Sequence, residues 1–228
     1  MGITCFLPCR KGSERVPRKN IKTFAGFEHG LVEVKLRQLD SCEVIDEIIL
    51  STNDEEIISY AESLKMDRLI VNHREERLCS STTSTDELVP LAMELANCEH
   101  ILWTHVTSPF FTSGVYCRFI DMYSTALQEG YDSLMSVKEL RSFIWNEDGP
   151  VNHEREVEKW PRTQTLKPLF EVDSGAFLNS RRNYAEQGDR IGSNPQFFVS
   201  PGHASFDIDW PEDHILAQEM VVSGVVDI

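Results

Sequence analysis

Residues 3–20 read ITCFLPCRKGSERVPRKN, a short apolar run that leads directly into a loop rich in positive charge. An apolar run of this length that ends in a polar loop is typical of a buried strand. Open α/β sheets bind phosphate at the loop after their first strand, where backbone amides and a helix N-terminus point at the ligand. This stretch therefore predicts the first strand of such a sheet and places its ligand at residues 10–20.

The rest of the chain alternates between apolar strands and helices. The expected strands are Ile3–Pro8, Glu47–Thr52, Arg68–Asn72, His100–Val106, Asp132–Val137, Phe170–Leu178 and His203–Asp209. The expected helices are His29–Cys42, Asn53 or Asp54 to Leu64, Ser84–Asn97, Thr112–Glu129, a short helix after Leu178 and a closing helix from Pro211. Continuous apolar strands that alternate with helices favour a mostly parallel α/β sheet covered on both faces. Lys138–Leu169 breaks this pattern and contains an expected hairpin at Glu147–Pro150. We expect it to be a small lobe inserted in a single domain of residues 1–228.

The composition excludes several classes of function. With 41% apolar and 26% charged residues the chain is an ordinary globular protein, and no apolar run approaches the ~20 residues that span a bilayer. The N-terminus lacks the order of a signal peptide, so we expect a cytoplasmic protein. A net charge of −15 argues against general affinity for nucleic acid or anionic membranes. The six cysteines form no CxxC pair and are expected to be free thiols.

Against this acidic background, the segment from Arg10 to Lys22 holds a dense cluster of positive charge and one acid, Glu14. Its basic residues are Arg10, Lys11, Arg15, Arg18, Lys19 and Lys22. Gly12 and Ser13 allow backbone amides to turn inward and form an anion cradle. The loop matches neither GxxxxGK[ST] nor GxGxxG, so it is neither a Walker A loop nor a dinucleotide loop. A solvated basic loop without a ligand is the alternative.

A second candidate site is Asp207-Ile208-Asp209, at the end of the last expected strand. Residues two apart on a strand point to the same side, so both carboxylates would face one ligand. A site with only two carboxylates suits Mg²⁺, because water and phosphate oxygens complete its octahedral coordination. A strand end that caps the following helix is the alternative.

Together these stretches resemble the acylneuraminate cytidylyltransferases, which include the CMP-sialic acid synthetases and enzymes that activate other nonulosonic and KDO-type sugars. The resemblance covers about residues 3–219. Its motifs are RKGSERVPRKN (10–20), STNDEEI (51–57), REERLCSSTTST (74–85), TSP (107–109), DSLMSV (132–137), PRTQ (161–164) and FDIDWPED (206–213).

The resemblance implies a Rossmann-like nucleotidyltransferase sheet of the nucleotide-diphospho-sugar transferase type, which transfers CMP from CTP to an acidic sugar with release of pyrophosphate. It also implies a Mg²⁺ or Mn²⁺ cofactor and a homodimer formed through the lobe 138–169. The implied catalytic residues are Arg10, Lys19 and Asp209. The implied nucleotide-binding residues are Arg10, Ser13, Lys19, Asn20, Arg74, Ser80 and Thr85. The implied metal ligands are Asp207 and Asp209. The implied acceptor-binding residues are His105, Thr107, Gln164 and Ser174.

Several positions depart from the family pattern. His105 stands where the family has glutamine, Phe110-Phe111 where leucine-arginine is usual, Leu78–Ser81 where LASD is usual, and Ser174-Gly175 where Asn-Gly is common. The phosphate and metal motifs are intact, so the changes indicate an acceptor other than N-acetylneuraminic acid. We interpret Phe110 and Phe111 as favouring a less charged or more deoxygenated acceptor.

Three alternatives remain open. The acceptor could be another acid, such as a legionaminic- or pseudaminic-type sugar, a KDO-type sugar or a phosphonate. The protein could instead be a metal-dependent glycosyltransferase that uses Asp207 and Asp209. It could also be a nucleotide-binding protein without catalytic activity.

Overall fold

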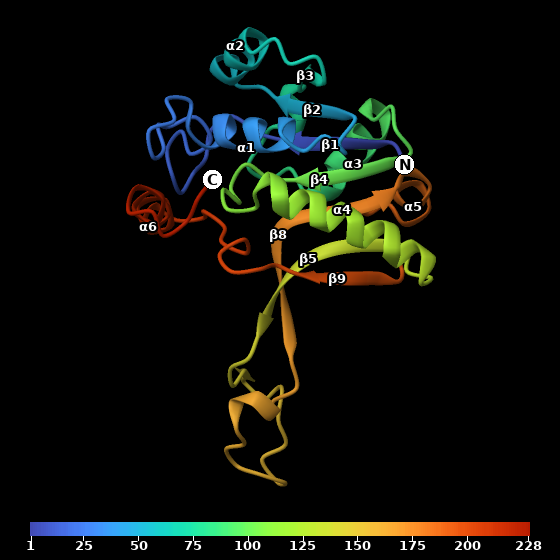
Figure 1. Ribbon diagram of the computed structural model, residues 1–228, viewed down its shortest axis with the longest axis vertical. Helices are drawn as coiled ribbons and strands as arrows, with labels where there is room; N and C mark the ends of the chain where they lie inside the picture. Colours follow the sequence, from blue (N-terminus) through green and yellow to red (C-terminus); the bar gives the residue numbers. More distant parts are fainter.

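A computed structural model describes all residues, 1–228. A seven-stranded sheet in the order β3-β2-β1-β4-β8-β5-β9 forms its centre (Figure 1). These strands are β1 (Ile3–Pro8), β2 (Glu47–Thr52), β3 (Leu69–His73), β4 (His100–Thr104), β5 (Ser133–Leu140), β8 (Leu169–Ser180) and β9 (Pro195–Val199). Only β8 runs antiparallel to its neighbours, β4 and β5. The expectation of a mostly parallel α/β sheet is confirmed.

Helices cover both faces of the sheet. They are α1 (Gly30–Asp40), α2 (Glu55–Ser63), α3 (Thr85–Leu95), α4 (Ser113–Gln128), α5 (Arg181–Gln187) and α6 (Pro211–Val222), with short 3₁₀ turns η1 (Glu76–Leu78) and η2 (Thr163–Thr165). Alternate residues of one strand serve the two faces: in β1, Cys5 and Leu7 pack in the cluster under α1 and α4, and Phe6 packs in the cluster under α3 and α5. Figure 1 shows α1 and α4 side by side in front of the sheet. This two-sided burial explains why the strands are apolar runs without polar alternation.

Local sequence signals fix several helix starts. The Asp54 side chain accepts a hydrogen bond from the Glu56 amide at the start of α2. Ser84 and Glu87 form a reciprocal capping box at the start of α3. Pro211 occupies the first turn of α6, where its missing amide hydrogen costs nothing. No helix has the length and apolarity needed to cross a membrane.

The expected strand His203–Asp209 is wrong. The strand beside β5 is β9, and the chain leaves the sheet after the Ser200 amide donates to the Val137 carbonyl. Pro201 and Gly202 then start a series of turns, with Gly202 in the left-handed region at φ 56°. Residues 203–209 return irregularly across the ends of the strands. The apolar residues among them resemble a strand because they pack inward, as Ile208 does with no exposed surface.

The expected lobe is a separate projection. Strands β5 and β8 continue beyond the sheet as a two-stranded stalk, in which Lys138 faces Glu171 and Leu140 faces Leu169. Figure 1 shows the residues between them projecting away from the sheet and its helices. The lobe contains the expected hairpin, whose short strands are β6 (Trp145–Asn146) and β7 (Gly149–Pro150).

Candidate active site

A cavity of about 400 Å³ opens at the carboxyl ends of β1 and β4. Parallel sheets present loop residues from several strands at this edge, which is where they bind ligands. Ten of the site residues expected from the sequence line the cavity: Arg10, Lys19, Asn20, Arg74, Thr85, His105, Thr107, Ser174, Asp207 and Asp209. The fold therefore brings the basic loop, the aspartate pair and most of the acceptor-side residues into one place.

Three expected residues do not line this cavity. The Ser13 hydroxyl accepts a hydrogen bond from the Val16 amide within the basic loop. The Ser80 hydroxyl bonds with the hydroxyls of its neighbours Thr82 and Thr83. Gln164 lies in η2 within the lobe and is not among the residues that line the cavity of its own chain.

The basic loop is held by its own polar contacts and by the end of β2. The Asn20 side-chain amide donates to the Arg10 carbonyl at 3.0 Å, which closes the loop. The Lys11 amide donates to Asn53 Oδ1 at 2.8 Å. Not every basic residue serves the cavity, because Arg18 turns away and forms a two-pronged ion pair with Glu56 at 2.6 and 2.7 Å.

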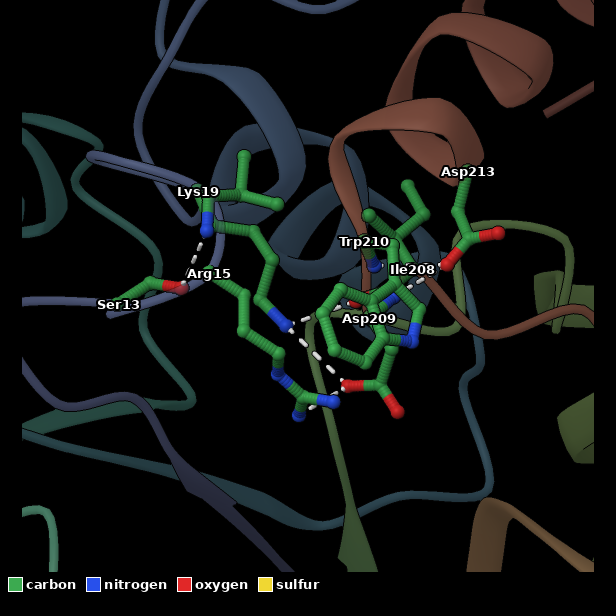
Figure 2. A network of polar contacts seen from close by, with 8 residues as sticks. Ser13, Arg15, Lys19, Ile208, Asp209, Trp210 and Asp213 are labelled. Atoms are coloured by element: carbon green, nitrogen blue, oxygen red, sulfur yellow. Dashed lines mark hydrogen bonds and ion pairs between the residues drawn. The ribbon is translucent and has the colours of Figure 1, made fainter.

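Lys19 and Arg15 converge on Asp209, as Figure 2 shows. Lys19 Nζ donates to the Ile208 carbonyl at 2.7 Å and lies 3.7 Å from Asp209 Oδ1. Burial lowers the pKa of Lys19, and the charges of Asp209 and Asp207 oppose that shift. Arg15 Nη2 lies 2.7 Å from the same Asp209 oxygen, and its guanidinium sits 5.0 Å from the centre of the Trp210 ring. Sequence analysis placed Arg15 in the basic loop and gave it no role at the site.

Asp207 is the more enclosed of the two aspartates. Burial raises its pKa, the Thr107 hydroxyl lowers it, and the carboxylate of Asp209 raises it. Asp207 Oδ1 is buried and has no hydrogen-bond partner. A buried carboxylate oxygen without a partner is costly, and a bound cation would satisfy it. The two aspartates therefore fit a hard divalent cation that takes few protein ligands, and no set of three or more His, Cys, Asp or Glu side chains is arranged as a metal site.

The aspartates reach this place without strand geometry. The Ile208 amide, which lies between them in sequence, donates to the Thr107 carbonyl at 2.9 Å. This bond ties the irregular segment 203–209 to the loop that follows β4. The shared strand face expected for the two carboxylates is thus wrong, although both still line the cavity.

Arg74 brings a further buried positive charge to the cavity. Its side chain is 6% exposed and donates to the Ser51 carbonyl at 2.7 Å. Its Nε is buried without a partner, and burial lowers the pKa of the guanidinium. An arginine with no carboxylate partner at a cavity wall is available for an anionic or carbonyl-bearing ligand.

A second cavity of about 590 Å³ shares Ser174, Asp207 and Asp209 with the first. Ser174 adopts φ 58°, a conformation that is uncommon outside glycine, asparagine and aspartate. Asp173 holds it there: its carboxylate accepts hydrogen bonds from the Gly175 amide and from the hydroxyls of Ser136 and Ser200. Backbone strain of this kind often occurs at functional sites.

The interpretation of Phe110 and Phe111 as acceptor-side residues is wrong. Both are buried in the core, 2% and 0% exposed, and neither lines a cavity at the site. The ring of Phe111 packs against Tyr116 and Phe198, with centroids 4.7 and 6.2 Å away. These positions therefore say nothing about the acceptor.

Lys35 is a residue that sequence analysis missed. It is fully buried in α1 and donates to the carbonyls of Ser108 and Phe111 at 2.9 and 3.1 Å. These bonds hold the loop after β4, which carries Thr107. A signal was present in the sequence, because Lys35 lies four residues after Leu31 on the apolar face of the helix.

The fold and the cavity define a class of enzyme. A mostly parallel sheet with a basic loop after its first strand, and two aspartates facing that loop, is the arrangement of a nucleotidyltransferase. More specifically, the chain belongs to the cytidylyltransferase family, whose sequence model matches residues 4–171.

Individual relatives agree with this assignment. The chain is 28% identical over 217 residues to a pseudaminic acid cytidylyltransferase of Campylobacter jejuni, covering 92% of this chain and 91% of the relative. It is 25% identical over 228 residues to N-acylneuraminate cytidylyltransferase A of Danio rerio, covering 96% of this chain and 51% of the relative. The fold is similar to the structure of CMP:2-keto-3-deoxy-manno-octonic acid synthetase complexed with CTP, with a TM-score of 0.68, 12% identity, and coverage of 98% of this chain and 100% of that one.

Proposed function

We propose that this cytidylyltransferase transfers CMP from CTP to an acidic sugar of the nonulosonic type and releases pyrophosphate. The observation that carries the proposal is the junction of the two cavities at Ser174, Asp207 and Asp209. The first cavity brings the cations Arg10, Lys19 and Arg74 together and suits the nucleotide, and His105 and Thr107 on its wall are proposed to face the acceptor. The second cavity continues from the three shared residues and gives the acceptor further room, so the two substrates would meet there.

The chemistry fits the residues present. An acceptor hydroxyl attacks the α-phosphate, an oxygen–phosphorus bond forms, and the bond to pyrophosphate breaks. Negative charge grows on the equatorial and leaving oxygens, so cations placed beforehand lower the barrier. Arg10 and Lys19 are proposed to supply this charge, and Asn20 and Thr85 of the same cavity to bind the rest of the nucleotide. Ser13 and Ser80, which lie outside the cavity lining, are proposed to contact the nucleotide only if their loops move toward it.

Asp207 and Asp209 are proposed to hold Mg²⁺ or Mn²⁺. When bound, such an ion neutralises phosphate charge and lowers the pKa of a coordinated hydroxyl. Lys19 and Arg15 lie against Asp209, so both cations stand next to one of the proposed metal ligands.

The proposed acceptor is a deoxygenated, diamino nonulosonic acid of the pseudaminic type, with N-acetylneuraminic acid a poor substrate. The Campylobacter jejuni relative activates pseudaminic acid and is similar along nearly its whole length. His105 supports a changed acceptor, because an imidazole cannot donate and accept at one edge as a glutamine amide does. Thr107, Ser174 and a partner chain's Gln164 complete the proposed acceptor side.

A homodimer is proposed to form through the lobe of residues 138–169. Trp145, Val157 and Trp160 of the lobe are 46%, 81% and 61% exposed. Next to the lobe, Phe170 on the stalk and Phe197 on β9 are 40% and 37% exposed, with ring centroids 5.2 Å apart. Apolar surface of this kind marks an interface, and a dimer would give Gln164 a place at the partner's cavity.

The test is pyrophosphate release from CTP with N-acetylneuraminic, pseudaminic and legionaminic acids, KDO and a phosphonate, and hydrolysis of nucleotide sugars as a control. We expect CTP-dependent turnover with a nonulosonic acid, fastest with the deoxygenated acids. Hydrolysis of nucleotide sugars without pyrophosphate release would favour a glycosyltransferase instead. If N-acetylneuraminic acid has a kcat/KM tenfold or more above the others, the acceptor assignment is wrong.

A further inference from the structure

Arg190 is a half-buried arginine without an acidic partner beside the cavity. It lies between α5 and β9, and no carboxylate oxygen lies within 4.0 Å of its guanidinium nitrogens, the distance that defines an ion pair. Its guanidinium instead lies 3.8 Å from the centre of the Phe177 ring and 5.6 Å from that of Trp103. Stacking on aromatic faces compensates in part for the lost hydration of the cation. An arginine held this way has a fixed position, and its N–H groups need an acceptor.

The acceptor is His105. Arg190 Nη1 lies 3.3 Å from His105 Nε2, and this is the hydrogen bond that Arg190 makes in the structure. A guanidinium only donates, so Nε2 of His105 must accept and carry no hydrogen. The hydrogen of the neutral imidazole is then on Nδ1.

The surroundings of His105 keep the ring neutral. Burial lowers its pKa to about 3, and the positive charges of Arg190, Lys19 and Lys35 act in the same direction. The ring is therefore uncharged near neutral pH. It makes no hydrogen bond through Nδ1 within the chain, although His105 lines the first cavity.

We propose that Arg190 is a positioning residue that locks His105 as the Nδ1–H tautomer, so that His105 offers a ligand one donor and no acceptor. The substrate group that it selects is then a hydrogen-bond-accepting oxygen, such as an amide carbonyl or a carboxylate. A hydroxyl that needs to donate finds no partner there. A polar group left without a partner at this point of the site weakens binding, so His105 can discriminate between acceptors.

The identity of the ligand as the acceptor sugar rests on the proposed function, whereas the tautomer does not. The first measurement is therefore a long-range ¹H–¹⁵N correlation spectrum of the imidazole groups, with His105 assigned from the signals that vanish in His105→Gln. We expect Nδ1–H in the wild-type protein. In Arg190→Met, which keeps apolar packing but removes the donor, we expect the Nε2–H form to appear.

Two further variants separate positioning from packing. Arg190→Lys keeps a donor and should keep the Nδ1–H tautomer, which also covers the case in which Arg190→Met does not fold. Arg182→Met is the matched control, because Arg182 on α5 is exposed and pairs with Glu186 away from the cavity. Its spectrum should equal that of the wild type.

Kinetics then test the selection. Arg190→Met should raise the KM for the acceptor about tenfold and leave the KM for CTP nearly unchanged. In a His105→Gln background the same change should have little effect, since Arg190 acts through His105. An Nε2–H tautomer in the wild type, or an unchanged tautomer in Arg190→Met, overturns the lock. An expected tautomer with unchanged acceptor KM overturns the selection of the acceptor. Absence of turnover with every acidic sugar refutes the proposed function and leaves the spectra to decide the lock.

Discussion

Replacement of Lys35 by methionine should remove a contribution that makes the protein more stable at pH 9 than at pH 7. Lys35 is fully buried, and its ammonium donates to the carbonyls of Ser108 and Phe111. Burial is the largest effect on its pKa, which it lowers to about 7 from 10.5. The folded protein therefore releases the lysine proton above about pH 7, while the unfolded chain retains it up to about pH 10.

The magnitude follows from this difference in bound protons. Where the unfolded state binds one proton more than the folded state, the free energy of unfolding rises by about 1.36 kcal/mol per pH unit. Because Lys35 is half titrated at pH 7, the gain from pH 7 to pH 9 is about 2 kcal/mol. The buried thiols act in the opposite direction as the pH nears 9, because burial raises the pKa of Cys5, Cys9 and Cys42 above their usual 9.0 and the unfolded chain loses these protons first. These thiols are present in the variant as well as in the wild type, so their effect drops out of the comparison.

The assay is urea unfolding at pH 7, 8 and 9 under reducing conditions, for the wild type, Lys35→Met and the control Lys65→Met, at an exposed lysine outside the lobe. The wild type and the control should gain stability over this range by about 2 kcal/mol more than Lys35→Met does. Each comparison is a change in unfolding free energy between two pH values within one protein. The cost of leaving the carbonyls of Ser108 and Phe111 without a donor in Lys35→Met is the same at both pH values and therefore cancels. Parallel pH profiles for the wild type and Lys35→Met would refute the reasoning.

Three more outcomes are expected. Lys19→Ala and Arg10→Ala should each lower turnover with CTP by roughly 10²-fold or more, because each removes a positive charge that is already in place where negative charge develops in the transition state. Near wild-type initial rates in both variants would contradict the assignment of these residues to the triphosphate. Turnover should require Mg²⁺ or Mn²⁺ and vanish in Asp207→Ala and Asp209→Ala, with circular dichroism spectra unchanged; metal-independent turnover would contradict the metal site. Sedimentation should give a homodimer built on residues 138–169, and a monomer at micromolar concentration would exclude it.

The predictions from the sequence are correct where a structural feature depends on residues close together in the chain. Strands such as Glu47–Thr52 are continuous apolar runs because both faces are buried, and the capping residues Asp54 and Ser84 act within one helical turn. Apolar runs and capping residues of this kind can be recognised from a few neighbouring residues. The segment 203–209 has the composition of a strand but lies outside the sheet, because β9 already occupies the edge beside β5. No local pattern distinguishes a chain that pairs in a sheet from one that packs on its ends.

The parallel α/β layers, the place of the basic loop after β1 and the aspartate pair near the end of the chain can all be predicted from local patterns. These follow from periodicity, turn residues and motif order. Which cations lie at the aspartates depends on tertiary packing: Lys19 and Arg15 meet Asp209, whereas Arg18 pairs with Glu56. It also decided that Phe111 packs in the core. The reason is that side-chain direction and burial depend on contacts between residues far apart in the chain, and those exist only once the sheet and its helices have packed.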